Sequence, residues 1–265
     1  MATQSKSLLS LTRRGSVDSR RIAQLAERSA LFAAQRWFAR ERQWISDQHV
    51  TLCRIAAPTF FEEKRAFWFA EQMRALGWEA IIDRDGNVLA TIAEFSNRPL
   101  IAVTAHLDTV LAPHRPEDIS VTPEGRLQGP GVADNGSGLA AILALARVFT
   151  ESPELEELAR SILFVANVGE EGEGNLSGMR YLCRQGPILD SIRAFVVLDG
   201  PSLDYITAQA VASRRFEVTV QGPGGHSWND QGTANPVHAL SHAISAYVQA
   251  AEFRNDGAGT RCAYN

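Results

Sequence analysis

Residues 100–110 read LIAVTAHLDTV, an apolar run that ends in polar residues. Residues 100–105 are apolar almost throughout and do not alternate with polar residues, which is typical of a strand covered on both faces by helices. The apolar run stops at His106 and Asp108. Because ligands of open α/β sheets bind outside the carboxyl ends of the strands, these two side chains predict a polar site at that edge.

Two later runs repeat this pattern. Residues 161–168 end just before Glu170 and Glu171, and residues 194–198 end at Asp199. Residues 136–149, apolar nearly all round, follow Asp134 and fit a buried crossover helix. Strands alternating with helices predict an α/β fold with a mostly parallel sheet sandwiched by helices.

The flanking sequence completes the predicted architecture. The pattern predicts one long amphipathic helix over residues 17–46, a helix over 61–76, and a hairpin of 78–83 with 87–93. After residue 208 we expect the start of a smaller α+β unit, with a strand at 214–220, a helix from Pro236 and a last strand at 259–265. The predicted domains are a disordered tail at 1–16, for which an organelle leader is the alternative, an incomplete catalytic metal-binding domain at 17–208, and a partial dimerisation or lid domain at 209–265.

Composition narrows the function. The 265 residues carry a formal net charge of −4, so no basic field favours nucleic acid. The cysteines are odd in number and far apart in the sequence: Cys53, Cys183 and Cys262. This pattern is typical of reduced thiols in a cytoplasmic protein. No apolar stretch is expected to reach the ~18 residues that span a bilayer.

The residue types at the strand ends favour a metal. Imidazole and carboxylate oxygens are ligands of Zn²⁺, and strand alternation would point His106 and Asp108 the same way, so that Asp108 can orient the ring. The adjacent Glu170 and Glu171 offer one carboxylate for a metal and one for activating water, and a cation would offset their repulsion. The residues alone also fit a solvated loop at this Glu pair.

Together these motifs resemble a known family. They are AHLDTV (105–110), GPGVADNGSG (129–138), VGEEGEG (168–174), VLDG (197–200) and GPGGHS (222–227). In this order they are similar to the di-zinc metallopeptidases that include aminoacylase, carboxypeptidase G, peptidase T and the deacylases of acetylornithine and succinyl-diaminopimelate. The resemblance runs from about residue 47 to the end of the chain.

The resemblance implies a role for each matching residue. His106 and Asp199 would hold one zinc, Glu171 the other, and Asp134 both. Glu170 would be the general base and Asp108 the acid that orients the imidazole. A cis peptide is implied between Asp134 and Asn135.

The resemblance also implies a role for one histidine of the second domain and the need for a further histidine that this sequence does not contain. His226 would reach across a homodimer to the partner's substrate, whereas its local sequence fits an exposed turn equally well. The family's second zinc takes a further histidine from beyond the small domain, so we expect this chain to be truncated at its C-terminus. The remaining histidines match no motif and are predicted to lie in loops or on helix surfaces: His49, His114, His238 and His242.

The resulting hypothesis is metal-dependent hydrolysis of an amide in a small peptide or N-acyl amino acid. It implies two Zn²⁺ per subunit in a complete chain, with Co²⁺ or Mn²⁺ as alternatives. The competing interpretation is a truncated, non-catalytic fragment that binds at most one ion or only dimerises. An NAD-type oxidoreductase and a serine hydrolase are disfavoured, because the sequence has neither a G-x-G-x-x-G turn after the first core strand nor a G-x-S-x-G elbow.

Overall fold

The computed structural model describes residues 24, 27–92, 98–185, 188–200, 206–208 and 216–252. The chain divides into two compact units, Met1–Ser202 and Leu203–Asn265. The α-helices are α2 (Ser29–Arg40), α3 (Arg42–Cys53), α4 (Glu63–Ala75), α5 (Gly138–Glu151), α6 (Glu156–Ala159), α7 (Ser177–Gln185) and α8 (Pro236–Glu252). The expected tail at 1–16 and the expected strand at 259–265 lie outside the described residues.

The first unit is built on a sheet with the order β1-β2-β6-β3-β7. The strands are β1 (Glu79–Ile82), β2 (Val88–Thr91), β3 (Leu100–His106), β6 (Ile162–Asn167) and β7 (Ile192–Val197), and a separate small pair is formed by β4 (Ser120–Val121) and β5 (Leu127–Gln128). β3 is parallel to both β6 and β7, while the predicted hairpin β1-β2 joins the sheet antiparallel to β6. The sheet is therefore mixed, and the parallel part is the part that carries the predicted polar strand ends.

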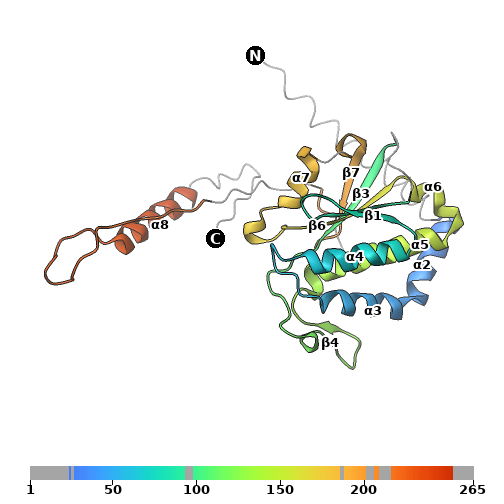
Figure 1. Cartoon of the computed structure of the whole chain (residues 1–265), viewed down its shortest axis with the longest axis horizontal. Coiled ribbons are helices and arrows are strands. Elements are labelled where there is room, and N and C mark those ends of the chain that lie inside the picture. The colour runs from blue at the N-terminus through green and yellow to red at the C-terminus, as the bar shows by residue number, and fades with distance from the viewer. Residues whose placement is uncertain are drawn as a thin grey trace, which may run out of the picture. The chain divides into compact units, whose positions relative to one another are not determined.

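Helices cover both faces of this sheet (Figure 1). Alternate residues of β3 enter different cores: Val103 packs with residues of α4 and α5, whereas Ala102 packs with Leu182 of α7. In β6, Phe164 and Leu163 divide in the same way. This two-sided burial explains why the strands read as continuous apolar runs, and the predicted α/β class is confirmed.

The predicted single helix at the N-terminus is wrong in its described part. The chain breaks at Glu41, where α2 ends and α3 begins. Trp37 of α2 packs beside α5, in a cluster with Val148, while Leu52 of α3 enters the main core. Trp44 of α3 still packs with the Trp37 cluster, so α3 contacts both clusters along its length.

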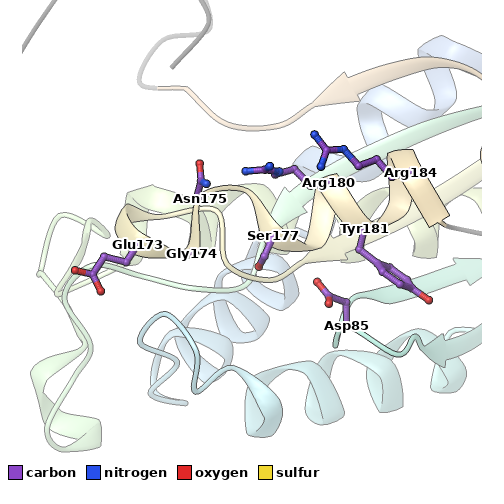
Figure 2. Close-up of a pocket in the computed structure, with 8 residues that line it drawn as sticks. All are labelled: Asp85, Glu173, Gly174, Asn175, Ser177, Arg180, Tyr181 and Arg184. Atoms are coloured by element: carbon purple, nitrogen blue, oxygen red, sulfur yellow. The ribbon is translucent and has the colours of Figure 1, made fainter. Parts of the chain in front are cut away.

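The hairpin turn is tied to the end of β6 and the start of α7. Asn87 donates to the Gly178 carbonyl at 3.1 Å and accepts from the Val168 N–H at 3.1 Å. A shallow pocket of about 370 Å³ lies here, with Tyr181 and Asp85 in its lining (Figure 2). These bonds hold the loop after β6, which carries the Glu170-Glu171 pair, against the hairpin.

In the second unit the helix expected from Pro236 is present as α8. Residues 216–220, the described part of the strand expected at 214–220, form no strand. A strand needs a hydrogen-bonding partner, and the described residues of this unit contain no second strand to provide one.

One helical segment of the described residues is long and apolar enough to be compared with a membrane span. By length and apolar composition alone, the segment Val132–Glu151 could cross a bilayer, contrary to the prediction that no stretch reaches that length. Leu139, Ile142 and Leu143 of this segment are fully buried in the main core. Burial of this kind is typical of a core helix, so its composition is weak evidence for a membrane span.

Candidate metal centre

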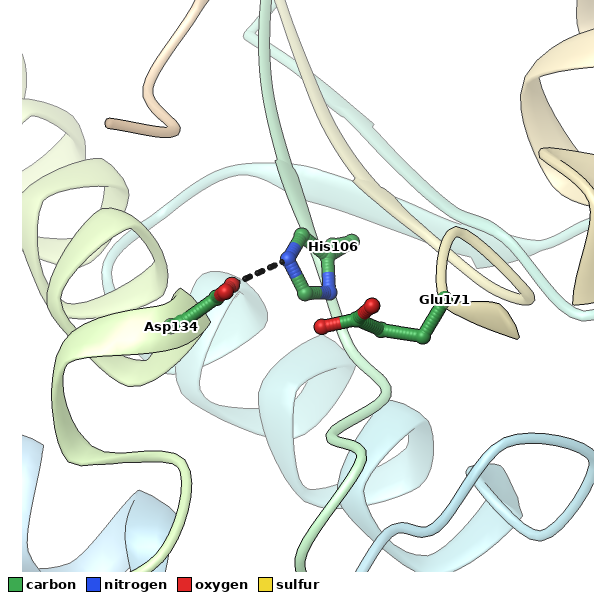
Figure 3. A group of neighbouring side chains, drawn as sticks. All are labelled: His106, Asp134 and Glu171. Carbon is green, nitrogen blue, oxygen red and sulfur yellow. Dashed lines mark hydrogen bonds and ion pairs between the residues drawn. The ribbon is translucent and has the colours of Figure 1, made fainter. Parts of the chain in front are cut away.

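Three ligand-type side chains from distant parts of the chain meet beyond the strand ends (Figure 3). His106 is the last residue of β3, Glu171 follows β6, and Asp134 lies in the turn Val132–Ser137 that precedes α5. One ligand atom of each lies within 4.8 Å of the others. The structure thus brings together three of the four predicted metal ligands.

The imidazole of His106 is held in one orientation. Its Nδ1–H donates to the Asp108 backbone carbonyl at 2.8 Å, and Nε2 lies 2.8 Å from Oδ1 of Asp134. The Asp108 carboxylate is farther from Nδ1, at 3.5 Å. The role predicted for Asp108 as the acid that orients the ring stays a prediction: its carboxylate lies near Nδ1, and its main-chain oxygen makes the closer contact. With Nδ1 protonated, Nε2 is the nitrogen available to a metal.

The carboxylate of Asp108 also holds the loop after β6. It accepts the backbone N–H groups of Glu170 at 3.0 Å and Glu171 at 2.9 Å. The hydroxyl of Thr59 donates to the same carboxylate at 3.0 Å. Asp108 is fully buried, and these bonds, with that of His106, lower its pKa although burial alone would raise it.

The ring of His106 takes up a proton readily in this environment. Burial opposes a charged imidazole, but the hydrogen bond and charge of Asp108 and the hydrogen bond with Asp134 outweigh it and raise the pKa of His106 to about 9. A group with this preference sits where positive charge is stabilised. The site therefore favours a cation beside Nε2.

The pKa shifts of the carboxylates also indicate a site that favours a cation. Burial raises the pKa of Glu171, and the charge of Asp134 raises it further. Burial likewise raises the pKa of Glu170 and of Asp199, and Asp199 adds its charge to the effect on Glu170. Carboxylates that repel one another in this way are stabilised by a bound cation. The imidazole and carboxylate donor set fits a divalent transition metal.

The turn that carries Asp134 is packed against α3. The Nε2–H of His49 donates to the Val132 carbonyl at 2.8 Å. A Cβ on Gly136 would lie 2.4 Å from the Cys53 sulfur, so only glycine fits there without displacement. The Asp134-Asn135 peptide is cis, as the resemblance implied.

His49 lies in a helix, as predicted, but it is not simply a surface residue. It is partly buried and supports the turn, whereas His114, His238 and His242 are exposed as expected. Sequence reasoning also missed Thr59 and Arg65, which contact the site through Asp108 and the Leu107 carbonyl. Asp134, His49 and Cys53 are linked by packing between a helix and a distant turn, for which the sequence carries no short-range signal.

The other predicted site residues, Asp199, Glu170 and His226, do not belong to this cluster of three. Asp199 follows β7, and its charge acts on both His106 and Glu170, but it is not in the group within 4.8 Å. Glu170 neighbours Glu171 in the same loop. His226 belongs to the second unit and is exposed, and its Nδ1 accepts the Trp228 N–H at 3.2 Å.

The comparisons with known proteins bear directly on this centre. The model of peptidase family M28 matches residues 87–243, more than half of the chain, and this span includes all of the predicted site residues. The chain belongs to peptidase family M28.

Curated relatives of this M28 chain are desuccinylases. A succinyl-diaminopimelate desuccinylase 2 of Ruegeria sp. (strain TM1040) is 32% identical over 184 residues, 64% of this chain and 45% of that protein. A succinyl-diaminopimelate desuccinylase of Janthinobacterium sp. (strain Marseille) is 27% identical over 191 residues, 66% of this chain and 48% of that protein. The expected resemblance to the zinc metallopeptidases is confirmed. The chain spans about half the length of the curated relatives it matches.

A solved structure shares the fold. A dipeptidase of Saccharomyces cerevisiae matches with a TM-score of 0.56 and 13% identity, over 82% of this chain and 52% of that chain. At this identity the likeness concerns the architecture alone. It agrees with a mixed sheet flanked by helices in this M28 chain.

The packing of Cys53 against the Asp134 turn predicts how fast this thiol reacts compared with that of Cys183. Cys53 is buried, and its burial raises the pKa of the thiol to about 11, whereas Cys183 is exposed. Because the thiolate is the nucleophile, we expect iodoacetamide at pH 8 to alkylate Cys53 at least ~100-fold more slowly than Cys183. Peptide mass spectrometry over time measures both rates. Equal rates in the folded chain would contradict this packing, and the urea-unfolded chain, in which the rates should converge, is the control.

Proposed function

We propose that this M28 chain carries the metal centre of a hydrolase that cleaves an amide bond of a small peptide or N-acyl amino acid. The observation that carries the proposal is the meeting of His106, Asp134 and Glu171 within 4.8 Å, from three separate segments. Membership of a peptidase family and the similarity to desuccinylases support the reaction class.

We propose zinc as the native metal, with Asp134 shared between two ions. His106 and Asp199 would complete the ligands of one ion in this chain, and Glu171 would bind the other. When bound, zinc supplies Lewis acidity and lowers the pKa of water to ~7. Cobalt and manganese accept the same donor types, so metal analysis is needed to distinguish them.

The proposed base is Glu170. Its backbone is anchored to Asp108, and burial raises the pKa of its side chain towards the range of an effective proton carrier. Glu170 would take a proton from the attacking water and pass it to the leaving amine. Asp108, through its main-chain oxygen, would keep the His106 ring aligned during the reaction.

For the second unit we propose a dimerisation or lid role in which His226 serves the partner's site. Its Nδ1 accepts main-chain N–H groups of Trp228 and Asn229, which leaves the proton on Nε2, where it can donate to a carbonyl oxygen. We also propose a cytoplasmic location, in keeping with the free thiols of Cys53 and Cys183.

Metal removal tests the proposal. We expect dialysis against a chelator to abolish hydrolysis of N-succinyl amino acids and dipeptides, and added Zn²⁺ to restore it. Elemental analysis of each sample gives the metal content, and a chelator already saturated with zinc is the control. Hydrolysis that persists in metal-free protein would contradict the proposed function, while metal binding without hydrolysis would favour the non-catalytic alternative.

A further inference from the structure

One buried charge near the metal centre has no part in the mechanism described so far. Arg65, in the first turn of α4, is 1% exposed. A buried guanidinium is costly unless hydrogen bonds replace its contacts with water. The bonds that Arg65 makes therefore indicate why a charge is kept in this core.

Arg65 bridges two main-chain carbonyls. Its Nε and Nη2 donate to the Ile55 oxygen at 2.9 and 2.6 Å, and its Nη1 donates to the Leu107 oxygen at 2.7 Å. Ile55 lies just after α3, and Leu107 lies between His106 and Asp108. The planar fork of arginine can serve both oxygens at once, which the single ammonium of lysine cannot do in the same geometry.

The Leu107 carbonyl belongs to the peptide group that enters Asp108. The N–H of Leu107 donates to the Asn167 carbonyl of β6 at 2.7 Å, so this residue is held on both sides. Because the peptide is planar, fixing its oxygen fixes the direction in which the chain enters Asp108. Both functions of Asp108 depend on that direction: its carbonyl orients His106, and its carboxylate anchors Glu170 and Glu171.

We infer that Arg65 is a positioning residue of the metal centre, which acts through the Leu107 carbonyl to align His106 and the Glu170-Glu171 loop. This inference rests on the proposed metal site but concerns a residue that is neither a proposed metal ligand nor the proposed base. The chain offers a control in Arg74 of the same helix, an exposed arginine whose Nε and Nη2 also donate to one main-chain carbonyl, that of Ala80, at 3.0 and 2.7 Å.

The test compares Arg65→Met and Arg65→Lys with Arg74→Met. We expect both Arg65 variants to bind Zn²⁺ about 10- to 100-fold more weakly in a chelator-competition titration, as for other outer partners of metal ligands. Arg74→Met should bind zinc as the parent does, although it also loses bonds to a carbonyl. If Arg65→Met does not fold, Arg65→Lys, which keeps the charge, carries the test. Parent-like zinc affinity in the folded Arg65 variants would overturn the inference.

A second readout separates this inference from the proposed function. In the metal-free chain, the ¹⁵N signals of the His106 ring report the Nδ1–H bond to Asp108. They should shift in Arg65→Lys and stay unchanged in Arg74→Met. If the parent chain binds no zinc, the proposed function fails, and the ring signals alone then decide: an unshifted His106 ring in Arg65→Lys would overturn the positioning role.

Discussion

Glu170→Gln is expected to lower the turnover of an N-succinyl amino acid or dipeptide by about 10²- to 10⁴-fold, the usual contribution of a general base. The amide keeps the shape of the side chain but cannot take up the proton. Since Glu170 is proposed as the base and not as a metal ligand, the zinc content should stay that of the parent. Steady-state kinetics and elemental analysis on the same sample measure both quantities.

The matched control for this variant is Glu173→Gln. Glu173 lies in the same acidic loop but is exposed, so its loss should leave turnover within about twofold, as for surface substitutions away from a site. Near-parent turnover of Glu170→Gln would remove Glu170 from the role of base. Loss of zinc in Glu170→Gln would instead make it a ligand.

Asp134→Asn is expected to have the largest effect on metal binding. Asp134 faces Nε2 of His106 at 2.8 Å and belongs with Glu171 to the grouped donors. The amide removes a negative charge from the centre of the site, so zinc affinity should fall by at least about 100-fold, beyond the 10- to 100-fold typical of outer partners. A chelator-competition titration followed by elemental analysis measures this loss.

A matched surface change shows whether charge alone explains that loss. Asp190 is an exposed aspartate of the same unit, and Asp190→Asn changes the net charge by the same amount. It should bind zinc with the parent's affinity. Parent-like affinity in Asp134→Asn would contradict the assignment of Asp134 as a shared ligand.

Much of the fold is predictable because local patterns carry it. The continuous apolar runs of β3 and β6 indicate strands buried on both faces, and the turn residues around Asp85 indicate the β1-β2 hairpin. Pro236 marks the start of α8. The break at Glu41 was not predictable, since the helical periodicity of the sequence continues through it.

The candidate site could also be predicted only in part. The places of His106 and Glu171 could be predicted, because each follows an apolar run of the sequence that forms a buried strand. Asp134 could be predicted from its place before the apolar run that forms α5. The side chains that hold these donors in place could not be predicted from the sequence. His49 and Arg65 act by donating to main-chain carbonyls of Val132 and Leu107, and every residue offers a carbonyl, so no residue type marks the recipient.

The sequence shows which side chains follow the apolar runs, and their types predict metal chemistry at this edge of the sheet. How these side chains are held is visible in the folded chain alone: the main-chain oxygen of Asp108 accepts from His106, and its carboxylate anchors the Glu170-Glu171 loop. Periodicity and side-chain type are local properties of the chain. Hydrogen bonds between a side chain and a distant peptide group depend on how helices and strands pack, and that is settled only when the whole core is assembled.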